Sequence, residues 1–411
     1  MKVLYISYDG MTDPLGQSQV LPYLVGLSRL GYQITLVSAE KPERYPAGKA
    51  IIEQICTEAG IDWQPVLYSR RYPVISAIKN SKSISAKAFE LHKAKQFDLV
   101  HCRSYISAMI GLDLKRKYGL KFVFDMRGFW PDERVDGKVW NLKNPVFYAV
   151  YKYFKRKEKE FLNAADHTIT LTENACDLIH EWSFLNHQPI PITVIPCCAD
   201  LDLFSYHTIS KAQREQCRQD LNIAPDDLVL CYLGSIGTWY MPTEMLQLFK
   251  TILQQNPKAK FFFITPDDPA HIQALAREQG IAAEHLVIRS AKRAEVPLYL
   301  AAADLGVFFI MPAYSKRASS PTKHGEMMGM GLPLICNAGV GDMDRIMQRT
   351  QSGFVLETFS AETYTAAANA IPSLLQLDKQ IIREGGEAVY SLEKGIAKFA
   401  AVYKEVLSKP K

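Results

Sequence analysis

Short apolar runs alternate with amphipathic segments along the first half of the chain, and this alternation limits the folds that the sequence can adopt. The runs lie at 2–8, 33–39, 98–102, 121–126 and 167–172. They suit strands that are buried on both faces of a parallel sheet. After the first run, apolar residues recur every three or four positions from Val20 to Leu30, and Gly31 follows as a helix stop. Strands and helices that alternate in this way predict a doubly wound α/β domain.

A second series of the same kind begins after a proline-bearing stretch at 192–204. Its strand candidates lie at 227–235, 260–266, 285–290, 304–310 and 331–337. We therefore predict two Rossmann-like domains, 1–198 and 199–392, with a last helix at about 393–408 that can pack back on the first. Two such domains in one chain bind a ligand in the cleft between them, at the carboxyl ends of the strands.

The charge of the chain is unevenly distributed. The formal net charge is +5, which is too small for a protein that lives on nucleic acid, so no nucleic-acid partner is expected. Residues 1–200 hold 26 Lys+Arg and 21 Asp+Glu, whereas the remainder holds 22 of each. All of the surplus therefore lies in the first half, which we expect to meet an anionic partner.

The eight cysteines form no CxxC pair, and several lie inside apolar runs, as Cys231 and Cys336 do. They are predicted to be buried thiols in a reducing compartment. The N-terminal MKVLYISYDG does not look like a signal peptide, and no apolar run is long enough to span a bilayer. The expected location is cytoplasmic.

The loop that follows the strand candidate 304–310 is the richest in chemistry. It carries Lys316, Arg317 and several hydroxyl side chains, and a helix is expected to begin near Lys323. Amides at a helix start, hydroxyls and cations are what a diphosphate needs. Glu326, in the first turn, can accept hydrogen bonds from a ribose diol. The alternative is a helix with an acidic first turn beside a solvated basic loop.

Four segments, in order, resemble the glycosyltransferases of family 4, which have the GT-B fold. PTKHGEMMGMGLPLI with NAGVGDMDRIMQRTQSGFVL resembles their donor-binding segment, and EVPLYLAAADLGVF resembles the approach to it. YLGSIGTWY resembles the Gly-Ser-x-Gly loop of the second domain. VIPCCADLDLF resembles the interdomain motif, with Cys197 and Cys198 in place of Asn-Gly. The resemblance extends from residue 1 to about 408, and the order of its segments makes it specific.

The resemblance implies a GT-B fold, with two Rossmann-like domains that face a central cleft. It implies a nucleotide-diphosphate sugar, UDP- or GDP-linked, bound mainly by the second domain and an acceptor bound mainly by the first. In the second domain, Glu326 corresponds to the glutamate that holds the ribose. The other donor-binding residues implied are Gly234, Ser235, Lys292, Arg293, Ser320, Thr322 and Lys323.

The sequence departs from the family pattern in two places. Ala318 stands where the family has the first glutamate of a pair, and the segment GSIGTWYMPTE lacks the Arg and Lys that many members use to neutralise the diphosphate. A departing diphosphate needs compensating charge, so this role is expected to fall to Lys323, Lys316, Arg317, helix amides or a cation from the first domain. Arg127, where many members have a histidine, is the leading candidate for that cation. The alternative is an ion pair with Asp125 or Asp132.

Two further residues of the first domain are candidates. Gly16 lies in the first βα loop and would let the backbone approach the donor. His101 matches a family histidine after the same strand, so it is a catalytic candidate, although a lone histidine at a strand end is more often a structural hydrogen-bonding residue. No metal is expected, because the Asp-x-Asp patterns at 200–202 and 342–344 lie in a hinge and at a helix start. No cofactor is expected besides the donor substrate.

Two basic and aromatic segments raise the question of membrane contact. The segment 145–162 combines aromatic side chains with five Lys and Arg, and 68–87 contains Arg70, Arg71 and Lys79 beside Tyr72 and Ile75. Such segments suit anionic headgroups. For 145–162 we favour a helix packed on the core with a solvated basic face, and 68–87 is preferred as the membrane element.

Taken together, the sequence predicts a retaining glycosyltransferase that moves a hexosyl unit from a nucleotide-diphosphate sugar to an acceptor hydroxyl. Retention is implied by the resemblance, with front-face attack and no protein nucleophile. The acceptor is expected to be a surface-polysaccharide or lipid-linked glycan intermediate, and the enzyme could lie on the inner face of the cell membrane. The alternatives are a nucleotide-sugar epimerase on the same fold and a non-catalytic, glycosyltransferase-like binding subunit.

Overall fold

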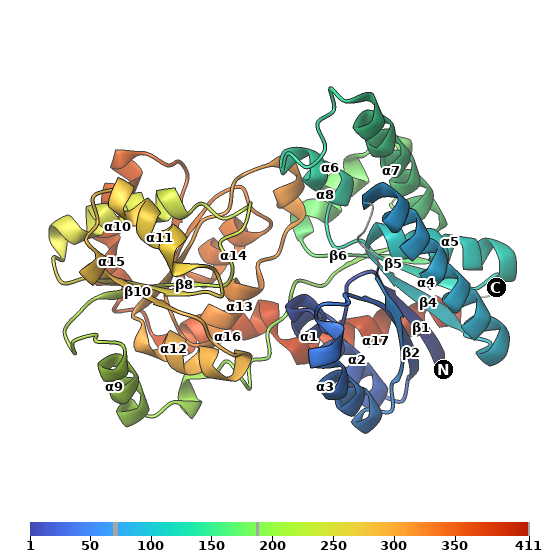
Figure 1. Cartoon of the computed structure of the whole chain (residues 1–411), viewed down its shortest axis with the longest axis horizontal. Coiled ribbons are helices and arrows are strands. Elements are labelled where there is room, and N and C mark those ends of the chain that lie inside the picture. Colours follow the sequence, from blue (N-terminus) through green and yellow to red (C-terminus); the bar gives the residue numbers. More distant parts are fainter. Residues whose placement is uncertain (69–72, 186–188, 410–411) are drawn as a thin grey trace. The chain divides into compact units, whose positions relative to one another are not determined.

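The computed structural model describes residues 1–68, 73–185 and 189–409, and the side chains of 73–78 are not described. The chain divides into two compact units, each treated by itself below (Figure 1). Unit 1 comprises Met1–Pro196 and Leu392–Lys411, and unit 2 comprises Cys197–Ser391. The first crossing between the units thus falls two residues before the expected boundary at 198.

Unit 1 is built on a parallel seven-stranded sheet with the strand order β3-β2-β1-β4-β5-β6-β7. The strands are β1 (Lys2–Ser7), β2 (Gln33–Glu40), β3 (Asp62–Leu67), β4 (Leu99–Arg103), β5 (Lys121–Asp125), β6 (His167–Thr170) and β7 (Ile192–Val194). The helices are α1 (Pro14–Gln19), α2 (Leu21–Arg29), α3 (Tyr45–Glu58), α4 (Pro73–Lys95), α5 (Ser104–Tyr118), α6 (Trp130–Asp136), α7 (Pro145–Ala164), α8 (Glu173–Glu181) and α17 (Leu392–Ser408).

Unit 2 repeats the design with a parallel six-stranded sheet in the order β10-β9-β8-β11-β12-β13. The strands are β8 (Val229–Leu233), β9 (Lys260–Ile264), β10 (Leu286–Arg289), β11 (Leu305–Phe308), β12 (Leu334–Asn337) and β13 (Gly353–Leu356). The helices are α9 (Lys211–Asp220), α10 (Pro242–Gln255), α11 (Pro269–Glu278), α12 (Val296–Ala302), α13 (Thr322–Gly329), α14 (Met343–Thr350), α15 (Ala361–Leu374) and α16 (Lys379–Tyr390).

Sequence patterning missed three strands, and all three lie at an end of a sheet. Strands β3, β7 and β13 have half-buried residues at most of their positions, whereas β4 and β5 are buried throughout. A strand at the edge buries less surface, so it has no continuous apolar run by which to recognise it. The doubly wound α/β architecture of both units is nonetheless the one predicted.

The last helix, α17, completes the core of unit 1. The Tyr32 hydroxyl donates to the carbonyl of Ala400 at 3.2 Å, and the rings of Tyr23 and Phe399 meet edge to face at 5.2 Å. Helix α2 has a glycine where α17 comes closest, because a Cβ on Gly26 would lie 2.3 Å from Cδ1 of Ile396. The chain therefore returns from unit 2 to finish the fold of unit 1.

Three further observations concern the described residues only. No helix among them is long and apolar enough to cross a membrane. No group of three or more His, Cys, Asp or Glu side chains is placed to hold a metal ion there. Of the cysteines, Cys176 is half-buried and the other seven are buried.

The contact between α2 and α17 can be tested with a larger residue at position 26. Gly26→Leu should destabilise unit 1 by about 1–3 kcal/mol, because the added side chain overlaps Ile396. It should also speed amide hydrogen exchange in α17. The measurements are urea unfolding and hydrogen exchange read by mass spectrometry. The control is Gly237→Leu, where a Cβ would meet open space. Wild-type exchange in α17 of Gly26→Leu would contradict the packing.

Candidate functional site

The start of α13 in unit 2 holds a buried lysine between two tyrosine rings. The Lys323 ammonium donates to the Tyr232 hydroxyl at 3.0 Å, and it lies 4.1 Å and 3.6 Å from the ring centroids of Tyr232 and Tyr240. Burial lowers the pKa of Lys323 well below its usual value, although Glu326 and Asp267 act in the opposite direction. A buried ammonium with so few polar partners is costly, so this side chain is poised to gain from an anion.

Glu326, one turn further along α13, forms an ion pair with Arg293. Their Oε1 and Nη1 atoms are 3.2 Å apart, and the guanidinium lies over the ring of Phe204 at 5.3 Å. Burial raises the pKa of the Glu326 carboxyl, and Arg293 and Lys323 oppose this rise. Sequence analysis assigned Arg293 and Glu326 to separate parts of the nucleotide, and the structure brings them into direct contact.

The Gly-Ser loop after β8 lies directly over Lys323. Gly234 has φ +104°, and a Cβ there would lie 3.3 Å from the Lys323 ammonium, so the loop can come this close only with glycine. The Ser235 hydroxyl donates to Asp267 at 2.9 Å, and the backbone N–H of Ile236 donates to the same carboxylate. Sequence analysis missed Asp267, whose only signal was its position just after strand β9.

The basic loop before α13 is partly internal. Lys316 is buried with its ammonium 3.7 Å from the ring centroid of Trp239, whereas Arg317 is exposed. Ser320 accepts a hydrogen bond from the backbone N–H of Cys197 at 3.1 Å. Ala318 is 1% exposed, so a buried methyl group stands where the family has its first glutamate.

Two of the predicted donor residues make few contacts of their own. Thr322 is the first residue of α13 and is half-buried. Lys292 is exposed, and its backbone N–H donates to Glu295 at 2.7 Å. The structure thus gathers Gly234, Lys323 and Glu326 around α13 and leaves Lys292 at its margin.

In unit 1, Arg127 follows β5 at the carboxyl edge of the sheet. It has φ +56° and is followed by Gly128 with φ +117°, so the chain turns sharply at this point. Its Nη1 lies 3.8 Å from Oδ1 of Asp125, which is the pairing weighed as the alternative. Burial raises the pKa of Asp125, but Arg127, His101 and Arg103 outweigh it and lower that pKa overall, so Asp125 is a carboxylate. Asp132, the other partner considered, instead accepts from Tyr151 at 2.8 Å.

His101 lies beneath Asp125 and has no exposed surface. Its Nε2 is 3.4 Å from Asp125 Oδ2, its Nδ1 is 2.9 Å from the Tyr403 hydroxyl, and its ring stacks on Tyr5 at 4.4 Å. Burial is the largest cause of a lowered pKa, so the ring is neutral. A carboxylate only accepts hydrogen bonds, hence Nε2 carries the proton and Nδ1 accepts from Tyr403. So placed, His101 can act on a ligand only through Asp125, and Tyr403, a residue of α17, was missed by sequence analysis.

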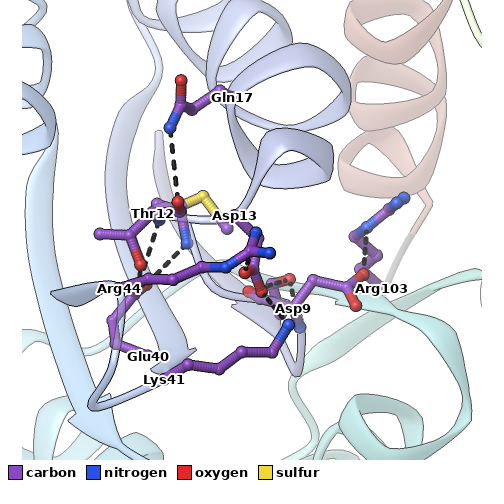
Figure 2. A network of polar contacts seen from close by, with 10 residues as sticks. Asp9, Thr12, Asp13, Gln17, Glu40, Lys41, Arg44 and Arg103 are labelled. Atoms are coloured by element: carbon purple, nitrogen blue, oxygen red, sulfur yellow. Dashed lines mark hydrogen bonds and ion pairs between the residues drawn. The ribbon is translucent and has the colours of Figure 1, made fainter. Parts of the chain in front are cut away.

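The first loop of unit 1 is held by a buried carboxylate. Glu40, at the end of β2, accepts from the backbone N–H groups of Met11 and Thr12 at 2.7 and 3.1 Å and from the Thr12 hydroxyl at 2.6 Å (Figure 2). Gly16 is needed by this loop itself, because a Cβ there would lie 2.2 Å from the carbonyl oxygen of Gly10. Its glycine is therefore explained by packing within the unit, and approach to a donor stays a prediction.

The same loop carries a second polar group on its outer side. Asp13 forms ion pairs with Lys41 at 2.6 Å and Arg44 at 3.0 Å, and Figure 2 shows both cations reaching it from the end of β2 and beyond. Asp9, just after β1, accepts from Arg103 Nε at 3.1 Å. Charged side chains thus gather at the carboxyl ends of β1, β2, β4 and β5, where ligands of such sheets bind.

Family models match both units of the chain. The model described as Glycosyltransferase Family 4 matches residues 19–203, and the model described as Glycosyl transferases group 1 matches residues 213–387. The chain belongs to the family 4 glycosyltransferases. Enzymes of this kind transfer a sugar from a nucleotide donor, and the two parallel-sheet units are the two halves of the GT-B fold.

Individual relatives are distant. A D-inositol 3-phosphate glycosyltransferase from Catenulispora acidiphila is 22% identical over 310 residues, which are 73% of this chain and 67% of the relative. The other two curated relatives, both named D-inositol 3-phosphate glycosyltransferase, are matched over 45% and 63% of their lengths.

Solved structures share the fold over the whole chain. A glycosyltransferase from Rickettsia africae has a TM-score of 0.73 at 14% identity, covering 100% of this chain and 99% of its own. The Anabaena protein HepE, crystallised with UDP and glucose, has a TM-score of 0.67 at 14% identity, covering 98% and 99%. A UDP-N-acetylglucosamine 2-epimerase from Listeria monocytogenes also matches, with a TM-score of 0.58 at 12% identity, covering 100% and 97%. The fold alone therefore does not separate a glycosyltransferase from an epimerase.

Of the two basic segments considered for membrane contact, 68–87 lies partly outside the described residues. Arg70, Arg71 and Tyr72 are not described, nor is the side chain of Ile75, so this prediction stays untested. The segment 145–162 is α7 almost in full, and its second half is packed on the core through Phe154, Glu158 and Phe161.

The hydrogen bond from Tyr403 can be tested by removing one oxygen atom. Tyr403→Phe should lower the free energy of unfolding of unit 1 by about 1–3 kcal/mol, because it leaves Nδ1 of the buried His101 without a donor. The control is Tyr32→Phe, which removes a hydroxyl from the same interface but leaves a helical carbonyl with other hydrogen bonds. Urea unfolding measures both. Equal losses in the two variants would count against the proposed proton arrangement.

Proposed function

We propose that this glycosyltransferase transfers a hexosyl unit from a UDP- or GDP-linked sugar to an acceptor hydroxyl with retention of the anomeric configuration. The observation that carries the proposal is the buried Lys323 at the start of α13, under the Gly234 turn. An ammonium in this position offers what a diphosphate seeks, a desolvated positive charge beside backbone N–H groups at a helix start.

In the proposed reaction the acceptor oxygen bonds to the anomeric carbon as the bond from that carbon to the donor phosphate oxygen breaks. The electron pair of the broken bond leaves with the nucleoside diphosphate, and the acceptor proton passes to a departing phosphate oxygen on the same face of the sugar. The protein lowers the barrier by stabilising the charge that develops on that phosphate. We assign this role in unit 2 to Lys323, helped by Lys316 and Arg317.

The ribose of the donor is assigned to Glu326. Its carboxylate is buried and oriented by Arg293, and a carboxylate accepts hydrogen bonds from both hydroxyls of a diol. Arg293 then serves as the residue that holds Glu326 ionised, with its guanidinium on Phe204. We keep Arg127 as the proposed cation of unit 1 that acts on the same leaving group, and its support is the sharp turn and the Asp125 carboxylate that orient it within that unit.

The acceptor is proposed to be an anionic or lipid-linked glycan intermediate, as in the synthesis of surface polysaccharides. Once α17 is counted with unit 1, that unit holds 31 Lys+Arg and 22 Asp+Glu, whereas unit 2 holds 17 and 21. The surplus of nine positive charges on unit 1 supports an anionic partner. The curated relatives are named for a phosphorylated acceptor, D-inositol 3-phosphate, which is consistent with this charge.

Nucleotide binding tests the donor site directly. Calorimetric titration should detect UDP or GDP binding, and Lys323→Ala should weaken it about 10- to 100-fold through loss of a charge-assisted contact. Glu326→Gln should weaken binding of the nucleoside diphosphate about tenfold. Lys211→Ala removes an exposed lysine of unit 2 and should change nothing. Absence of binding by any nucleotide would favour the non-catalytic subunit that the buried Ala318 suggests, and full affinity in Lys323→Ala would refute the site.

Proton uptake gives an independent check on Lys323. Burial lowers its pKa in the free protein, and a bound diphosphate should raise it. Between these two values, at about pH 8, binding should take up a proton, and affinity should fall as the pH rises through the pKa of the complex. Titrations in buffers of different ionisation enthalpy measure the uptake. It should vanish in Lys323→Met, and an uptake that persists unchanged in this variant would contradict the assignment.

A further inference from the structure

The loop between α6 and α7 and the first half of α7 form a strongly basic segment. Residues 137–157 contain six Lys and Arg and no Asp or Glu. Acidic side chains flank the segment at Asp136 and Glu158 but do not interrupt it. In unit 1 the loop projects beyond the ends of α6 and α7 (Figure 1).

Large apolar side chains are exposed on the same segment. Val139, Val146, Tyr148 and Tyr153 are 54%, 60%, 48% and 47% exposed. They are four of the thirteen exposed large apolar side chains of the described residues, gathered within fifteen positions. Single exposed apolar residues are ordinary, whereas a group of them marks a contact surface.

The helix separates an inner and an outer face at this point. Tyr151 and Phe154 point inward, where Tyr151 donates to Asp132 and the ring of Phe154 packs on Trp130 at 4.8 Å. Val146, Ala149 and Tyr153 follow one another at spacings of three and four residues on the outer face and are all exposed. The exposed apolar side chains therefore cannot be explained as part of the core.

The cations of the segment also divide between the two faces. Lys155 is held by Asp132 at 2.9 Å and by Glu158, so its charge is used within the unit. Lys138, Lys143 and Lys152 are exposed, and the ammonium of Lys152 lies 5.6 Å from the ring centroid of Tyr148. A surface with lysines around aromatic and aliphatic side chains is defined here as the α7 surface: Lys138, Val139, Lys143, Val146, Tyr148, Lys152 and Tyr153.

We propose that the α7 surface docks on the headgroups of an anionic lipid bilayer, with its apolar side chains entering the headgroup region. Charge complementarity favours this occupant, since anionic lipids attract lysines while the interface accepts tyrosine and valine. A second copy of the chain is disfavoured, because a symmetric contact would bring like-charged lysines together on a unit that already carries nine surplus positive charges. The proposal stands apart from the assignment of the donor site, and it locates membrane contact on α7 in place of the 68–87 segment preferred from sequence.

Vesicle flotation with the full-length chain tests the proposal. The protein should float with vesicles of phosphatidylcholine containing about 30% phosphatidylglycerol at about 0.1 M salt, and not with pure phosphatidylcholine. The double variant Val146→Glu, Tyr148→Glu should lose at least about tenfold in binding, because it removes two apolar groups and adds two negative charges. The matched control Leu30→Glu, Ile51→Glu alters two apolar residues of unit 1 that are exposed to a similar degree.

Two measurements keep the result unambiguous. Thermal unfolding should be the same in both double variants and the wild type, since the changed side chains are exposed. Failure of the wild type to float with the anionic vesicles, or equal loss in both double variants, would overturn the proposal. So would sedimentation equilibrium that shows a dimer which the α7 variants dissociate, because the occupant would then be a second copy.

Discussion

The account of this glycosyltransferase depends on one buried ammonium. Lys323 has a hydroxyl and two aromatic rings around it, and burial opposes its charge. Its position is fixed by α13, which packs tightly on α16, where a Cβ on Gly325 would lie 2.7 Å from Cβ of Tyr390. The Tyr390 hydroxyl also meets Nδ1 of the buried His324 at 2.9 Å. Unit 2 thus spends stability to hold a cation where an anion can bind it, as binding sites often do.

The sequence predicted the architecture well, because buried parallel strands are continuous apolar runs. It failed at β3, β7 and β13, whose burial is partial and whose sequence signal is therefore weak. In the donor site, motif spacing placed Gly234, Lys323 and Glu326 together. It could not show that Arg293 contacts Glu326, because that pair is set by how η4 (Arg293–Glu295) and α13 lie in space.

Unit 1 shows the limit of sequence reasoning more clearly. His101 was a candidate for catalysis, yet its partner Tyr403 is 302 residues away and comes from α17. Glu40 and Asp267 were missed for the same reason, since each is a single acidic residue at a strand end whose hydrogen bonds to a distant or neighbouring loop appear only in three dimensions. Returning α17 to unit 1 also sharpened the charge argument, because it moves five lysines into the unit already in surplus.

The central claim is retaining transfer by this fold, and the anomer of the first product tests it most directly. With the donor identified by nucleotide binding, proton NMR can follow the sugar released to acceptor or, more slowly, to water. The account predicts release of nucleoside diphosphate and, from an α-linked donor, a sugar that appears first as the α-anomer. First appearance of the β-anomer would contradict retention, and conversion of the donor into its epimer without release of nucleoside diphosphate would contradict transfer itself.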